Sequence, residues 1–98
     1  MNKEREIWKY SNPKEANHRA KLIFGDDYEL DISTRKDKKY MIKGDFTNDK
    51  WVHFGAWGME DYLKHGSDER RENFIRRNHK WKNMPENTPA FLSYYILW

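Results

Sequence analysis

The sequence predicts a small α+β domain, in which an antiparallel sheet of about four strands is packed by one basic amphipathic helix and a short apolar C-terminal helix. Three observations favour this fold. Apolar and polar residues alternate between residues 22 and 56, as is typical of strands. Residues 68–81 follow a helical pattern that begins with acidic and ends with basic residues. Thr88 and Pro89 then mark the start of a last, apolar segment.

The composition limits the chain to one domain with an aromatic core. The sequence has 98 residues, no cysteine and a formal net charge of +3. This length leaves room for a single domain, and the lack of cysteine excludes a disulfide framework or a zinc site built on thiolates. Hydrophobic residues make up only 37% of the chain, but five Trp, six Tyr and five Phe supply large apolar surfaces.

The N-terminal part ends in a polar, proline-containing stretch. We therefore expect residues 1–18 to form an arm or a loosely attached segment, and residues 19–98 to form the single domain. Residues 1–10 lack the apolar run of a signal peptide, and no stretch approaches the roughly 20 apolar residues of a membrane span. The sequence thus predicts a location inside the cell and no membrane partner.

Two hairpins account for the alternating region. Residues 22–24 and 28–32 flank a Gly-Asp-Asp turn and predict the first hairpin. A basic turn at residues 35–39 leads to the second hairpin, which we expect to consist of residues 39–45 and 50–56. Two glycines, at positions 55 and 58, stand where the last strand should stop, so the backbone there is expected to need a positive φ.

Two helices complete the predicted domain. Ser67 and Asp68 are good N-cap residues for a helix that runs towards Trp81, with one face against the sheet and a strongly basic neighbouring face. After a loop at residues 82–87, the last helix is apolar almost all round. It is therefore either buried under the sheet or offered to a partner.

The basic face of the first helix is the leading candidate site. Residues 70–82 carry six basic side chains and one acidic one. Arginine donors match phosphate oxygens, and each neutralised phosphate releases counterions, so this pattern predicts phosphate-directed nucleic-acid binding. A solvated helix face is the alternative interpretation. The candidate nucleic-acid-binding residues are Arg70, Arg76, Arg77, Lys80, Lys82, Arg35, Lys36, Lys38, Lys39 and Trp57.

Aromatic residues allow a second interpretation, a protein interface. Most of the rings are expected to form the core, and Trp57, between two glycines, is the exception that we assign to nucleic-acid contact. Large exposed apolar patches often mark interfaces. The candidate protein-interface residues are Phe91, Tyr94, Tyr95, Trp98 and Trp8.

Catalytic and metal chemistry find little support in the sequence. His53, His65 and His79 are spaced unlike a helical pair or usual zinc ligands, and the chain has no phosphate loop or nucleophile elbow. We therefore expect no catalytic residue, metal or cofactor. A metal-dependent nuclease that uses His65 or Asp61 is a third, weaker hypothesis.

Residues 39–98 contain an ordered series of short motifs. The series is KWVHFGAWGMEDY at residues 50–62, HG at 65–66, RRENFIRRN at 70–78, TPAFLS at 88–93 and LW at 97–98. It resembles a family of small uncharacterised proteins encoded by large DNA viruses of algae and protists and by some tailed phages. That family usually has Asp where this chain has Ser67 and His where it has Asn78.

The resemblance implies a viral or phage origin and a compact accessory protein, with the host-cell interior or the virion as its location. The motif itself has a structural explanation, in which Asp61 and Arg71 form an ion pair within the fold and Trp98 closes the core. We expect a non-enzymatic protein that binds nucleic acid. The alternative is a minor virion protein that contacts other virion proteins through its termini.

Overall fold

The computed structural model describes residues 2–98, and its sheet is open, antiparallel and three-stranded. Strands β1 (Glu29–Ile32), β2 (Lys38–Lys43) and β3 (Val52–Ala56) lie in the order β1-β2-β3. The β2–β3 hairpin confirms the second predicted hairpin with slightly shorter strands. Tyr40 pairs with Phe54 across it, and both side chains are buried in the core. The α+β class is confirmed, whereas the prediction of about four strands is wrong.

The missing strand is part of helix α2 (Pro13–Phe24). Asn12 caps this helix, since its Oδ1 accepts a hydrogen bond from the backbone N of Glu15 at 3.2 Å. Ala16 and Ala20, one helical turn apart, are fully buried against the core. Ile23 and Phe24 also pack against the core, whereas Leu22 is exposed. A run of three apolar residues at 22–24 fits a helix as well as a strand. The antiparallel partner of β1 is therefore β2.

The N-terminal residues also have regular structure. Helix α1 (Lys3–Glu6) runs into the 3₁₀ turn η1 (Ile7–Lys9), and Ile7 is fully buried in the core. The Lys3 ammonium donates to the backbone carbonyls of residues 33, 35 and 38 at 2.7, 2.6 and 2.8 Å. A boundary at residue 18 would fall in the middle of α2.

The remaining short helical elements lie between β2 and β3 and after β3. The elements are the 3₁₀ turn η2 (Asp45–Thr47) before β3, and then α3 (Tyr62–His65), α4 (Asp68–Arg77) and the 3₁₀ turn η3 (His79–Asn83). Gly55 and Gly58 have φ values of 82° and 93°, as predicted. The helix expected to run towards Trp81 ends at Arg77. Asn78 is its C-cap residue, and the Asn78 side chain donates from Nδ2 to the backbone carbonyl of Phe74. The expected loop at 82–87 thus begins inside η3.

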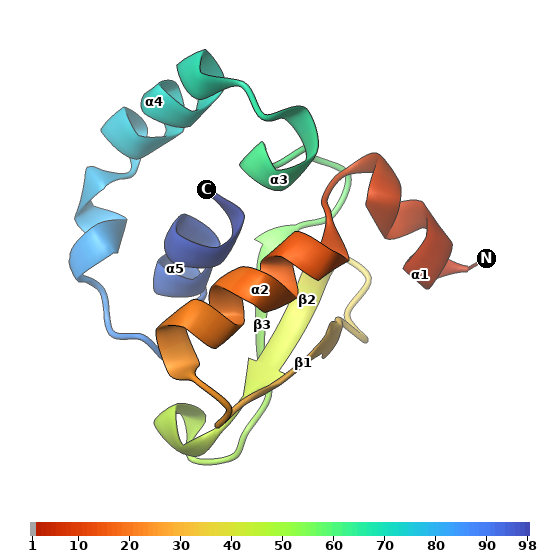
Figure 1. Ribbon diagram of the computed structural model, residues 1–98, viewed down its shortest axis with the longest axis vertical. Helices are drawn as coiled ribbons and strands as arrows, with labels where there is room; N and C mark the ends of the chain where they lie inside the picture. The colour runs from red at the N-terminus through yellow and green to blue at the C-terminus, as the bar shows by residue number, and fades with distance from the viewer. Residues whose placement is uncertain (1) are drawn as a thin grey trace.

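One face of the C-terminal segment is buried in the core. Helix α5 (Pro89–Leu92) starts after the predicted N-cap, Thr88, and continues into one π-helical turn, η4 (Ser93–Leu97). This segment packs against β3 and α2 (Figure 1). Leu92, Ile96 and Leu97 are at most 1% exposed. A Cβ atom at Gly55 would lie 2.8 Å from Leu97 Cδ1, so glycine permits the close approach of η4 to β3.

No helix within residues 2–98 is long and apolar enough to cross a membrane.

Candidate nucleic-acid interface

Helix α4, at the edge of the fold, carries three of the predicted basic residues, Arg70, Arg76 and Arg77. Ser67 Oγ caps it by accepting from the backbone N of Arg70 at 3.3 Å, and acidic residues fill its first turn. Phe74 is the only buried residue of the helix, so the other side chains of α4 are partly or fully exposed to solvent. In Figure 1, α4 lies at the periphery, with α5 nearer to the sheet.

The structure leaves most of the candidate basic side chains open to solvent. Seven of them are exposed, and Lys38 is half-buried. The exposed residues are Arg35, Lys36, Arg70, Arg76, Arg77, Lys80 and Lys82.

A cleft of about 890 Å³ brings part of this set together. Its walls come from β2, β3, α4, η3 and the C-terminal segment, which are far apart in the sequence. Lys38, Arg70 and Arg77 all line it, so the basic turn and the basic helix both contribute to its walls. The other residues that line the cleft are Lys39, Gly55, Ala56, Met59, Glu60, Asn73, Phe74, Asn78, Trp81, Pro89, Ala90, Ser93, Leu97 and Trp98.

The cleft has positive charge that the fold does not neutralise. Arg70 Nη1 lies 3.2 Å from Glu60 Oε1, and both side chains are about half exposed. Neither Arg77 nor Lys38 forms an ion pair with any of residues 2–98. These two side chains are therefore available to an anionic ligand.

Comparison with known proteins places this region in a described family. The model of DUF5754, a family of unknown function, matches residues 28–78, just over half of the chain. The chain belongs to DUF5754. The DUF5754 match includes the sheet, α3 and α4, and therefore Lys38, Arg70 and Arg77, but it ends before η3 and the C-terminal segment. No curated protein and no solved structure is significantly similar to the chain.

Lys39 differs from the other candidates within the DUF5754 region. It is 2% exposed, and its Nζ lies 3.2 Å from Oδ2 of Asp61, which is 1% exposed. Burial lowers the pKa of Lys39 against the opposing effect of Asp61, and burial raises the pKa of Asp61 against the opposing effect of Lys39. Lys39 is thus committed to an internal ion pair and does not extend the exposed basic surface.

The predicted Asp61–Arg71 ion pair is wrong, because Asp61 pairs with Lys39. Arg71 Nε instead donates to the backbone carbonyl of Trp98 at 2.7 Å. The Trp98 ring stacks on Phe74 at a centroid distance of 4.3 Å. Arg71 and Phe74 together hold the C-terminal segment of this DUF5754 chain against α4.

Trp57 is engaged within the fold. Its ring is half-buried, makes an edge-on contact with Tyr10 at 5.3 Å, and lies 4.9 Å from the Lys3 ammonium. Trp57 does not line the cleft. Trp81 does line it, although the sequence predicts that most rings other than Trp57 form the core.

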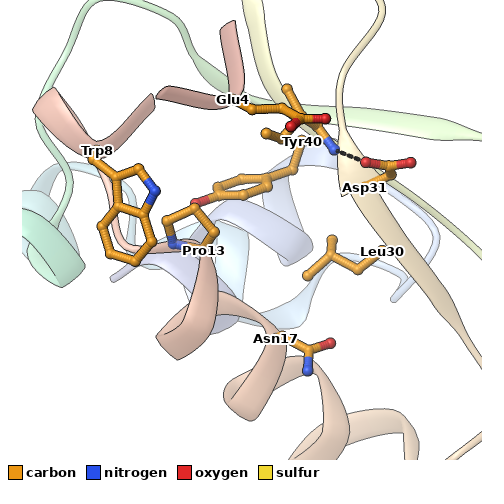
Figure 2. Close-up of a pocket in the computed structure, with 8 residues that line it drawn as sticks. Glu4, Trp8, Pro13, Asn17, Leu30, Asp31 and Tyr40 are labelled. Carbon is orange, nitrogen blue, oxygen red and sulfur yellow. Dashed lines mark hydrogen bonds between the residues drawn. The ribbon is translucent and has the colours of Figure 1, made fainter. Parts of the chain in front are cut away.

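The candidate protein-interface residues are divided between two places. Phe91, Tyr94 and Trp98 are half-buried in the C-terminal segment, and Tyr95 is 38% exposed. Trp8 is 42% exposed beside a second hollow of about 370 Å³. Figure 2 shows Trp8, Pro13 and Tyr40 around this hollow, between the N-terminal helices and β1.

The three histidines considered for catalysis lie in separate environments. His53 Nδ1 is 2.6 Å from Ser33 Oγ, and His79 Nδ1 is 3.3 Å from the carbonyl of Arg76. His65 Nδ1 accepts from the backbone N of Ser67 at 2.9 Å. Within residues 2–98, no group of three or more potential metal-ligating side chains comes together.

His65 gives a test of the local electrostatics. Burial, reinforced by Arg70, lowers its pKa from the ordinary value of 6.5. His65 therefore binds a proton more readily in the unfolded chain than in the folded chain. The free energy of unfolding should fall as the pH drops below about 6.5. We expect the free energy of unfolding to fall more for the wild-type chain than for His65→Gln between pH 7.5 and 5.5, as measured by urea titration. An equal loss in both chains would contradict this assignment.

Proposed function

We propose that this DUF5754 protein binds nucleic acid through phosphate-directed basic residues. The observation that carries the proposal is that two basic segments supply side chains to one cleft, Lys38 from the first and Arg70 and Arg77 from the second. Arg77 and Lys38 have no acidic partner among residues 2–98. Such groups gain most from phosphate, because binding costs no existing ion pair and releases counterions.

The neighbouring exposed residues extend this surface. Arg76, Lys80 and Lys82 follow along α4 and η3, and all three are exposed. Backbone contact rather than base-edge reading suits this arrangement, since positive side chains on a helix surface carry no sequence information by themselves. We propose that the protein acts as a viral or phage accessory factor in the host cell or virion, without catalysis.

The double variant Arg76→Ala/Arg77→Ala tests the surface. We expect its affinity for a labelled DNA duplex to fall about tenfold or more at 50 mM salt, because charge-assisted contacts are lost. The slope of log affinity against log salt concentration should fall by about 2, since each phosphate contact contributes about 1. Fluorescence anisotropy measures both quantities.

The matched control is Lys9→Ala/Lys14→Ala. It removes the same amount of charge from exposed positions in η1 and α2, outside the interface. We expect this variant to bind nearly as the wild-type chain does. If the two double variants weaken binding equally, net charge rather than this surface is responsible, and the proposal is wrong.

A protein contact at Trp8 is the second candidate function. Its support is an exposed tryptophan beside a hollow that Pro13, Leu30 and Tyr40 also line (Figure 2). Exposed aromatic residues at the rim of a hollow are typical anchors of protein interfaces. The change Trp8→Ser should leave the affinity for nucleic acid unchanged and remove a virion protein that co-purifies with the wild-type chain. Retention of that protein by the variant would count against this function.

A further inference from the structure

The cleft between α4 and the C-terminal segment is not only basic. Phe74, Trp81 and Trp98 line it together with Lys38 and Arg77. A surface that binds only the phosphates of a duplex does not need aromatic rings beside its cations. The combination of a cation and an aromatic ring is typical of sites that bind both the phosphate and the base of an unpaired nucleotide.

The three aromatic side chains differ in what they leave open. Phe74 is 8% exposed, and it stacks on Trp98 with the two ring planes 3° apart. Trp81 meets Phe74 edge-on at 5.7 Å with ring planes 80° apart, and Trp81 is half-buried. The Trp98 ring is thus stacked on Phe74 and contacted by His65, whereas Trp81 makes only the edge-on contact with Phe74 and keeps part of its indole surface for a ligand.

The size and polarity of the cleft suit the same ligand. Its volume of about 890 Å³ lies within the range of roughly 300–1,000 Å³ for small-ligand pockets. The unpaired cations Lys38 and Arg77 can contact a phosphate. Asn73 is exposed on the wall of the cleft, and its amide can donate to and accept from the edge of a base.

We propose that this cleft binds an unpaired nucleotide of single-stranded nucleic acid, with the base on Trp81 and the phosphate at Arg77 and Lys38. This inference rests on the proposed function and specifies its substrate class. In a duplex the faces of the bases are stacked on one another, so they cannot reach Trp81. A single strand can offer both groups, and the protein should therefore prefer it to a duplex.

The experiment compares three labelled probes at 50 mM salt by fluorescence anisotropy. The probes are a single strand of ten thymidines, an abasic strand with the same phosphates, and a ten-base-pair duplex. Stacking of one base contributes enough free energy for a preference of about fivefold or more over the abasic strand. We expect Trp81→Leu to remove this preference while binding of the abasic strand persists.

A matched pair of variants keeps the test independent of folding defects at Trp81. Arg76 and Arg77 are adjacent, exposed residues in the last turn of α4, but only Arg77 lines the cleft. We expect Arg77→Glu to weaken binding of the thymidine strand at least fivefold more than Arg76→Glu does. Circular dichroism would verify that each variant is folded.

The outcomes separate this inference from the proposed function. Equal, salt-dependent binding of the thymidine and abasic strands would overturn the nucleotide site and leave the basic interface standing. Equal effects of the two glutamate variants would also overturn it. Failure of all three probes to bind at low salt would overturn the proposed function and this inference together.

Discussion

Removal of residues 94–98 is expected to unfold the domain. The deletion takes away Ile96 and Leu97, which are 0% and 1% exposed and belong to the core cluster. Truncation of one buried aliphatic side chain to alanine costs about 2–5 kcal/mol, whereas a small domain is stable by about 5–15 kcal/mol in total. Loss of both side chains and of the Phe74–Trp98 stack would therefore remove most or all of the free energy of unfolding.

A matched pair of leucine variants isolates the contribution of burial. Leu97 is buried under β3, and Leu22 is 73% exposed on α2. Leu97→Ala should lower the free energy of unfolding by about 2–5 kcal/mol, whereas Leu22→Ala should change it by less than about 0.5 kcal/mol. Urea titration followed by circular dichroism measures both. A truncated chain that stays folded, soluble and cooperative would instead assign the segment to an interface with a partner.

Replacement of Asp61 by Asn should destabilise the fold by about 3–5 kcal/mol, because it leaves the Lys39 ammonium buried without a counter-charge. The adjacent residue provides the control. Glu60 and Asp61 each lie 3.2 Å from a basic nitrogen, but the Glu60–Arg70 pair is about half exposed and the Asp61–Lys39 pair is not. Glu60→Gln should therefore cost less than about 1 kcal/mol.

A double replacement distinguishes an ion pair from general packing at this position. Lys39→Met combined with Asp61→Leu removes both buried charges and fills the same space with apolar side chains. Its free energy of unfolding should return close to the wild-type value, since a well-packed apolar pair often matches a buried ion pair. If the double variant is as unstable as Asp61→Asn, the unpaired charge is not the cause of the loss.

The parts of the fold that the sequence predicts are those with local signals. Ser67 and Thr88 act as N-caps because their hydroxyl groups reach the backbone three residues ahead, and short sequence patterns reveal this. The conformations of Gly55 and Gly58 follow from the end of a strand in the same way. Residues 22–24 were misassigned because a run of three apolar residues does not distinguish a strand from a helix.

The candidate site could be predicted only in part. The basic character of α4 is visible in the sequence, but the presence of Lys38 and Arg77 in one cleft depends on how the sheet and helices pack. The same packing buries Lys39 and pairs it with Asp61, 22 positions away, although Arg35 and Lys36 in the same basic turn are exposed. The contacts of Lys3 could not be predicted from the sequence either, because its three acceptors are backbone carbonyls brought together by tertiary structure.

The salt dependence of nucleic-acid binding tests the proposed function most directly. Labelled single-stranded DNA, duplex DNA and RNA would each be titrated with the wild-type protein at 50 and 200 mM salt, with anisotropy as the readout. About four phosphate contacts predict a loss of affinity of roughly 50- to 150-fold between these concentrations. No binding at 50 mM salt, or an affinity that salt does not change, would contradict a phosphate-directed basic interface.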